Sequence, residues 1–161
     1  LFPYTTLFRS LRRRFHPLRL RIGIGVGRIE RASSAQAPVN LDATGDAFVR
    51  ARAALEVVAG TKASRHEPLS EARTGSERLD CVSGALLHLA DLLTARITDT
   101  QWEAIAAVER HGRQTRAATA LGKDESTVSR ALKHAAYSHL LEALDALGIV
   151  LGSAAGEGGM E

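Results

Sequence analysis

A short segment of the chain, Asp124–Lys133, carries several polar side chains of types that suit contact with a nucleic acid. They are Ser126, Thr127, Ser129, Arg130 and Lys133. Small hydroxyl groups let a helix approach the DNA major groove closely, and an arginine can donate two hydrogen bonds to guanine or bind phosphate. The pattern predicts a helix whose outer face meets the edges of DNA base pairs through Ser126, Thr127 and Arg130.

A preceding helix, joined by a tight turn, is needed to position this DNA-facing helix. The residues before Asp124 predict that first helix. Thr115 can cap a helix whose inward positions are Ala118 and Leu121. Gly122 follows, where a helix often ends on a left-handed residue that glycine adopts without a Cβ penalty. Two helices joined by a short turn that contains glycine are typical of the helix-turn-helix unit.

The second helix is expected to begin at Asp124, whose carboxylate can accept hydrogen bonds from the free N–H groups of the first turn. Val128 and Leu132 are four residues apart and therefore share its buried face. Lys123 stands where an apolar residue is more usual, and Glu125 brings a negative charge close to the DNA-facing end. The register as a whole still predicts that this second helix docks in the major groove.

Cationic side chains around both helices are expected to hold phosphates. The assigned residues are Lys123, Lys133, Arg113 and Arg116. Residues 110–134 carry six basic side chains against Asp124 and Glu125, a local charge of +4, although residues 101–161 carry −2 overall. The sequence therefore predicts a basic surface confined to the two-helix unit.

The chain as a whole, with 161 residues, 45% of them hydrophobic, suits one domain or two small ones. Its net charge of +3 comes from residues 1–60, which carry +6. The single cysteine, Cys81, excludes an internal disulfide and a thiolate metal cluster, as suits a reducing cytoplasm. No apolar run reaches the roughly 20 residues that span a bilayer, and no secretory pattern opens the chain. We expect a cytoplasmic bacterial protein without a membrane partner.

The first ten residues, Leu1–Ser10, resemble the translation of a short-read sequencing adapter, and no methionine begins the chain. Such a scar lies outside fold reasoning. Phe2, Tyr4 and Phe8 are therefore left out of the predicted core, and the chain is expected to be a fragment whose natural segment before Leu11 is missing.

Residues 11–60 predict a truncated α/β module. Within 18–29 the residues alternate, with Leu20, Ile22, Ile24 and Val26 on one side and glycines on the other. Three glycines weaken a strand unless a neighbour packs closely on their face. A helix with small side chains is expected over 46–58.

Residues 61–75, rich in Gly, Ser, Thr, Pro and charge, predict a linker. A helical helix-turn-helix domain is expected over 76–150, and a disordered tail over 151–161. The helix over 76–96 is expected to bury Leu79, Val82, Leu86, Leu89 and Leu93. Further helices are expected over 101–111 and 135–147, the latter either extending the recognition helix or packing separately. The predicted fold class is α+β, mostly α.

Three segments resemble the SatD family of bacterial proteins: LRIGIGVGRI at 20–29, NLDATGDAFVRARAALE at 40–56 and TVSRALKHAAYSHLLEALDAL at 127–147. The resemblance implies an N-terminal α/β module joined to a C-terminal helix-turn-helix. The first two segments are also similar to the end of class III nucleotide cyclase domains, which have a ferredoxin-like fold. Those domains carry their metal-binding aspartates before the equivalent of Leu11, so no catalytic residue is carried over to this chain.

Other reactive residues predict structural roles. Asp42 and Asp46 suit a helix cap and turn, the six histidines lack zinc spacing, Cys81 is expected to be a buried thiol, and Trp102 a core anchor. We therefore expect that the chain is not an enzyme and that it binds neither a metal nor a cofactor.

The leading prediction is sequence-specific binding of double-stranded DNA by a transcriptional regulator, with a homodimer formed through the helix at 76–96 or 135–147. Two alternatives stay open: a nucleotide-binding or cyclase-like module with a regulatory helical C-terminus, and a helical protein-interaction module.

Overall fold

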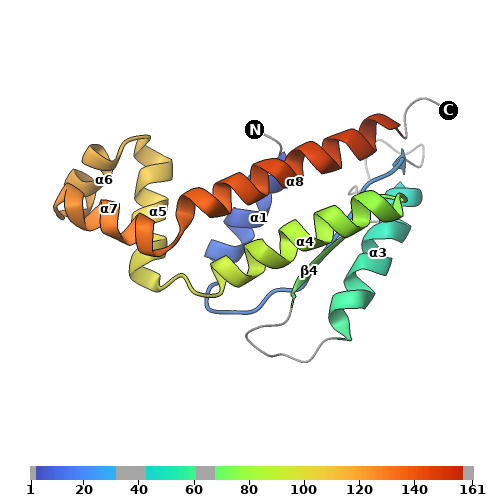
Figure 1. The fold of residues 1–161 in the computed structure, drawn as a ribbon, viewed down its shortest axis with the longest axis horizontal. Helices are drawn as coiled ribbons and strands as arrows, with labels where there is room; N and C mark the ends of the chain where they lie inside the picture. The colour runs from blue at the N-terminus through green and yellow to red at the C-terminus, as the bar shows by residue number, and fades with distance from the viewer. Residues whose placement is uncertain (1–2, 32–42, 61–67, 158–161) are drawn as a thin grey trace.

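The computed structural model describes residues 3–31, 43–60 and 68–157 of the chain (Figure 1). Helices predominate around a small parallel sheet, so the fold is α+β and mostly α, as predicted. The helices are α1 (Pro3–Arg14), α3 (Asp46–Ala59), α4 (Glu77–Thr94), α5 (Asp99–His111), α6 (Gln114–Leu121), α7 (Glu125–His134) and α8 (Tyr137–Glu157). The strands are β1 (Ile22–Gly25), β2 (Glu30–Arg31), β3 (Ala43–Thr44) and β4 (Ser70–Arg73).

The parallel sheet joins β1 to β4, with Ile22 opposite Ser70 and Gly25 opposite Arg73. A short antiparallel pair joins β2 to β3. Helix α3 packs on both strands of the parallel sheet, and α4 packs on β4. The predicted helix over 46–58 is thus confirmed as α3, and it packs on the parallel sheet formed by β1 and β4.

The glycines of β1 let α3 approach the sheet at backbone distance. A Cβ added at Gly23 would lie 2.5 Å from the carbonyl oxygen of Ala51, and one at Gly25 only 2.0 Å from that of Ala47. Both distances are shorter than any real contact of a Cβ, so only glycine fits. The alternating glycines therefore mark a close strand–helix contact, which is the condition under which the sequence allowed a strand here.

The prediction of a linker over 61–75 is wrong for its last part, because Ser70–Arg73 form the buried strand β4. Residues 61–67 lie outside the described residues. Strand β4 was missed because its sequence, SEAR, has no apolar alternation. Its polar side chains are buried because distant residues satisfy them: the hydroxyl of Ser70 lies 2.7 Å from a guanidinium nitrogen of Arg12 and 3.0 Å from Asp91.

Arg12 and Asp91 form a buried ion pair under the sheet, with the guanidinium 2.5 Å from the carboxylate. The same carboxylate accepts a hydrogen bond from the backbone N–H of Leu69. Burial lowers the pKa of Arg12 below its ordinary value, and the charge of Asp91 opposes that shift. The pair ties α1 and α4 to the entry of β4.

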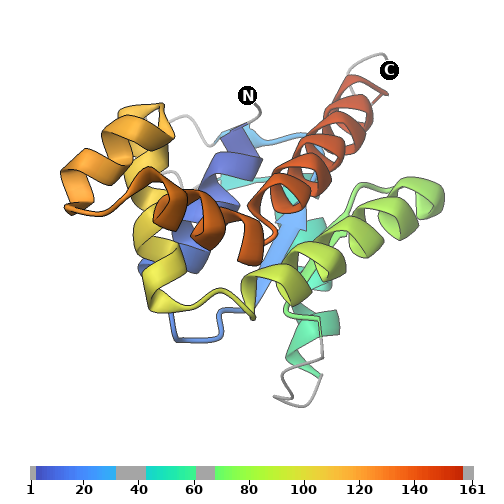
Figure 2. The same cartoon turned by 60° about the vertical axis from the view of Figure 1, so that its left-hand side comes forward.

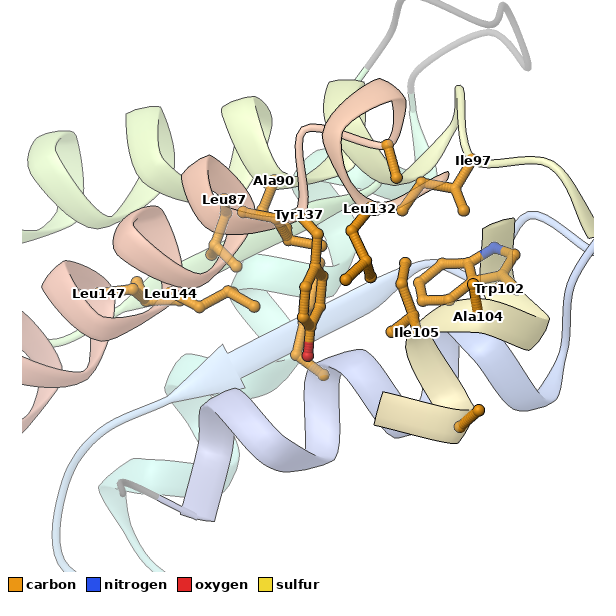
Figure 3. Packing of buried hydrophobic residues seen from close by; sticks show 14 of the residues in the cluster. Leu87, Ala90, Ile97, Trp102, Ala104, Ile105, Leu132, Tyr137, Leu144 and Leu147 are labelled. Atoms are coloured by element: carbon orange, nitrogen blue, oxygen red, sulfur yellow. The ribbon is translucent and has the colours of Figure 1, made fainter. Parts of the chain in front are cut away.

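One hydrophobic core extends through both halves of the molecule (Figure 3). Leu87 of α4 and Leu144 of α8 belong to the same cluster as Ile105 of α5 and Leu132 of α7. Phe8 also lies in this core, with 2% of its surface exposed, so the expectation that residues 1–10 stand outside the fold is wrong at this position.

The buried face of α4 agrees only in part with the predicted one: Leu79, Leu86 and Leu93 are partly buried against the core. Val82 and Leu89 are exposed, whereas Leu87 and Ala90 are buried, together with small and polar residues of the same helix. The side facing β4 and α8 uses small residues because those elements lie close to it; Gly84, for example, lies against the Glu71 side chain. Leu89 and Leu92 of α4 are therefore left exposed, whereas Leu87 is fully buried.

Helix α8 leaves the α5–α7 unit and runs along α4 (Figure 2). Among the described residues it is the one helix long and apolar enough, by length and composition, to cross a membrane, over Tyr137–Gly156. The sequence analysis did not single out this helix, because polar residues such as Glu142 and Asp145 interrupt its apolar residues. Leu140, Leu144 and Leu147 of this helix are buried in the core of the protein.

Helices α7 and α8 are separate, which decides between the two alternatives for residues 135–147. The break lies at Ala135 and Ala136, where Ala136 adopts a left-handed conformation with φ of 48°. Helix α8 continues to Glu157, so the predicted disordered tail over 151–161 is wrong for residues 151–157, and residues 158–161 lie outside the described residues.

Candidate nucleic-acid interface

Helices α5, α6 and α7 form a three-helix unit at one end of the molecule (Figure 1). Helix α5 begins with a reciprocal cap: the hydroxyl of Thr98 accepts from the N–H of Gln101, and the Gln101 side chain accepts from the N–H of Thr98. Gly112 ends it in the left-handed region, with φ of 73°. The helix predicted over 101–111 is thus confirmed as α5, although it begins two residues earlier, at Asp99, and α6 follows directly.

The turn between α6 and α7 has the geometry that Gly122 predicts. Gly122 has φ of 62° and ψ of 32°. Its N–H donates to the carbonyl of Thr119, and the N–H of Lys123 donates to the carbonyl of Ala118 at 3.0 Å. These two bonds close the helix in the way that a left-handed glycine allows, so that three residues separate the end of α6 at Leu121 from the start of α7 at Glu125.

Two predicted caps need correction. Asp124 does precede α7, with the extended backbone of a capping residue, but its carboxylate makes no capping hydrogen bond. Thr115 lies inside α6 rather than before it, because α6 begins at Gln114 and Arg113 occupies the cap position. Thr115 offers its backbone carbonyl to the hydroxyl of Thr119 one turn later.

The inward face of α7 is as predicted. Val128 is 1% exposed and Leu132 is also buried. On α6 the buried residues are Ala117 and Ala118, whereas Leu121 is partly buried. Alanines at the α6–α7 contact leave room for the two helices to approach closely.

The outward face of α7 presents four of the five polar residues of this helix that were predicted to contact DNA. The exposed residues are Ser126, Ser129, Arg130 and Lys133. The last three lie three, four and seven positions along the helix from Ser126, so all four share one face, opposite Val128 and Leu132. The fifth, Thr127, is half-buried, since it lies between the outward face and the side packed on the unit. Arg130 lies back along the helix, with its Nε donating to the carbonyl of Ser126 at 3.2 Å.

The predicted phosphate contacts divide into two kinds. Lys123 pairs with Glu103 of α5 at 2.5 Å, so its charge is already compensated within the unit. That pair also accounts for a lysine where an apolar residue is more usual. Arg113 and Arg116 are exposed at the start of α6, a turn that has neither an acidic residue nor a side-chain cap. Unsatisfied N–H groups at a helix N-terminus, together with two arginines, favour a phosphate.

The body of the protein holds the three-helix unit through buried side chains (Figure 3). Trp102, Ile105 and Leu132 pack from the unit into the common core, which confirms Trp102 as a core residue. The hydroxyl of Tyr137 donates to Glu109 of α5 at 3.0 Å. Burial, and then the charge of Glu109, raises the pKa of Tyr137 to about 12.

Sequence reasoning missed several residues that the structure brings together. Arg50 donates from one guanidinium nitrogen to the carbonyls of Val26 and Thr74, at the ends of the two parallel strands. Glu103 was missed as the partner of Lys123 because 20 residues separate them. Cys81, predicted as a buried thiol, is exposed on α4.

No group of three or more His, Cys, Asp or Glu side chains that could hold a metal ion occurs among the residues described. The chain was also compared with known proteins. No family model, curated protein or solved structure matches it.

Proposed function

We propose that this protein binds double-stranded DNA through α6 and α7 and acts as a transcriptional regulator of the bacterial type. The observation that carries the proposal is the α6–Gly122–α7 geometry, which leaves Ser126, Ser129 and Arg130 on one exposed face. A helix of this kind docks its outward side chains in the major groove. The resemblance of 127–147 to the SatD family supports the same proposal.

In the proposed complex one cationic side chain contacts base edges and the others contact phosphates. Arg130 reaches base edges when it leaves the Ser126 carbonyl, and Lys133 contacts phosphate. Arg113 and Arg116 hold a phosphate at the start of α6. Lys123 contributes less, because Glu103 neutralises it.

The test is a fluorescence-anisotropy titration of the full chain with a random-sequence DNA duplex at several salt concentrations. We expect affinity to fall steeply with salt, because each phosphate contact releases a counterion. Lys133→Ala is expected to weaken binding and to reduce the salt slope by about 1. Arg130→Ala should do the same, and should cost about 1–3 kcal/mol on any sequence selected for tight binding.

Arg52→Ala is the matched control, since Arg52 is exposed on α3 and its loss removes the same charge from another part of the surface. It should leave both the affinity and the salt slope unchanged. Equal effects of Arg52→Ala and Lys133→Ala would mean that the duplex meets the net charge of the protein rather than α7. No binding at low salt by the folded chain would overturn the proposal and leave the nucleotide-binding and protein-interaction alternatives.

We also propose a homodimer through α4. Val82, Ala85, Leu89 and Leu92 form an exposed apolar stripe with the three- and four-residue spacing of a helix–helix seam. The other candidate helix, α8, already buries its leucines inside the protein. Sedimentation should show a dimer that Leu89→Glu dissociates, whereas Ile149→Glu, on the exposed side of α8, should not. A monomeric parent chain at high concentration would rule this out.

A further inference from the structure

A cavity of about 440 Å³ lies where the end of α1, the end of α4 and the start of α5 meet. Its walls combine apolar side chains, among them Leu69 and Trp102, with the charged Arg12, Asp91 and Arg96. Cavities that bind small molecules have roughly 300–1,000 Å³ and this mixture of apolar walls and a few polar groups. The cavity lies away from the outward face of α7 and belongs to no part of the proposed DNA contact.

Two buried donors on the wall of this cavity lack an acceptor. The side chain of Trp102 is 5% exposed, and its indole N–H has no hydrogen-bond partner within the described part of the chain. The same holds for the Nε of Arg12, whose side chain is 8% exposed. In Figure 3 the indole nitrogen lies on the side of the ring away from Leu132 and Tyr137. Buried donors are nearly always satisfied, so the indole N–H in particular points to a bound acceptor group in the cavity.

The charges of the wall favour an anion. Three arginines, Arg12, Arg19 and Arg96, line the cavity against two aspartates, Asp91 and Asp99. Asp91 is engaged with Arg12, and Asp99 lies 3.1 Å from the His16 imidazole. Arg96 is exposed at the end of α4 and makes no ion pair among the described residues. An anionic group at the opening of the cavity would lie near Arg96, and its oxygen atoms could accept a hydrogen bond from the indole N–H of Trp102.

We propose that this cavity binds a small organic anion, an apolar body such as a ring system bearing one carboxylate, sulfonate or similar acceptor group. The apolar body lies against Trp102 and Leu69, and the anionic oxygens accept from the indole N–H and meet Arg96. Such a ligand bridges the end of α4 and the start of α5, the first helix of the DNA-contacting unit. Control of DNA binding by the ligand rests on the proposed function, whereas the binding site itself does not.

Trp102 makes the test direct, because it is the one tryptophan of the chain. The probe is 1-anilinonaphthalene-8-sulfonate, and its matched control is N-phenyl-1-naphthylamine, which has the same rings without the sulfonate. We expect the anionic dye to bind saturably at one site per chain, with energy transfer from the indole. The uncharged dye should bind at least about tenfold more weakly, a difference of about 1.4 kcal/mol.

Two variants locate the site. Trp102→Phe keeps an aromatic wall but removes the donor, and it should weaken binding of the anionic dye about fivefold to tenfold, read from the emission of the dye itself. Arg96→Ala should weaken binding severalfold and, being a surface change, should leave the fold intact. Arg52→Ala should have no effect. Equal binding of the two dyes, or unchanged affinity in both Trp102→Phe and Arg96→Ala, overturns the proposal.

A DNA titration with and without saturating dye separates the two proposals. Linkage requires that any effect of the dye on DNA affinity be matched by the same factor in the effect of DNA on dye affinity. We expect a factor of five or more. Dye binding without DNA binding would refute the proposed function and leave the site standing, and DNA binding that the dye does not change would refute the regulatory link alone.

Discussion

Asp91 is the side chain on which most of the buried polar structure depends. It neutralises Arg12, and it accepts hydrogen bonds from the hydroxyl of Ser70 and the N–H of Leu69. The arrangement ties three segments that are far apart in the sequence. A buried guanidinium without its carboxylate keeps its desolvation cost and loses the compensating charge.

We therefore expect Asp91→Asn to lower the free energy of unfolding by about 3–5 kcal/mol. Urea denaturation followed by circular dichroism measures it. Asp145→Asn, on the exposed side of α8, is the control and should change stability by less than about 0.5 kcal/mol. The double change Arg12→Met with Asp91→Leu should recover only part of the loss, because it removes the unpaired guanidinium but leaves the Ser70 hydroxyl and the Leu69 N–H without their acceptor. A loss below about 1 kcal/mol in Asp91→Asn would mean that the pair is solvated.

Tyr137 gives stability a dependence on pH in the alkaline range. Its pKa is raised to about 12 in the folded protein, against about 10 in an unfolded chain, because it is buried beside Glu109. The folded state then holds the proton more tightly. The resulting stabilisation is complete below about pH 10 and is lost as the pH rises towards about 12.

Comparison of the parent chain with Tyr137→Phe isolates this effect. The variant should be less stable by about 1–2 kcal/mol near pH 8, because Glu109 loses a donor. The difference should shrink between about pH 10 and about pH 11.5, as measured by urea denaturation across that range. A difference that stays constant with pH would show that Tyr137 ionises at its ordinary pKa.

The contact between β1 and α3 is the element-scale feature that tolerates least change. A Cβ at Gly25 would collide with the Ala47 carbonyl, and α3 could move aside only by giving up its close packing on both strands of the sheet. We expect Gly25→Ala to cost about 3 kcal/mol of stability. Thermal unfolding measures it against Gly156→Ala, where nothing lies within 4 Å and helix propensity predicts no loss. Similar melting temperatures for the two variants would contradict this packing.

The elements that sequence reasoning identified are those whose signals are local. Gly122 sets the turn, and Val128 and Leu132 set the inward face of α7, within a span of eleven residues. Strand β4 was missed because the partners that allow Ser70 to be buried, Arg12 and Asp91, lie far away in the sequence. The inward face of α4 was misplaced for a similar reason, since small residues packed against β4 and α8 compete with leucines for the interior.

Only the part of the candidate site that depends on local sequence could be predicted. The outward face of α7 follows from helical period alone, so Ser126, Ser129, Arg130 and Lys133 could be named in advance. The pairing of Lys123 with Glu103, by contrast, depends on how α5 packs against the turn. The cavity beside Trp102 joins three segments and has no local signal in the sequence.

At the scale of the whole molecule, the shared core predicts that the sheet and the three-helix unit unfold together. Trp102 reports on α5, and far-ultraviolet circular dichroism reports on all helices. We expect the two signals to give the same midpoint in urea, as for a single cooperative transition. A fragment restricted to residues 76–150 should unfold at lower urea concentration, since it lacks Arg12 and β4. Loss of the tryptophan signal before the helical signal would show that the unit unfolds independently.

Helix α8 begins directly after the left-handed Ala136 and runs along α4, away from the three-helix unit. Its 21 residues form a rod of about 30 Å. A tilt of about 10° about Ala136 would displace the far end of this rod by about 5 Å. Any change in the orientation of α7 that tilts α8 would therefore be enlarged to a movement of that size on the far side of the molecule.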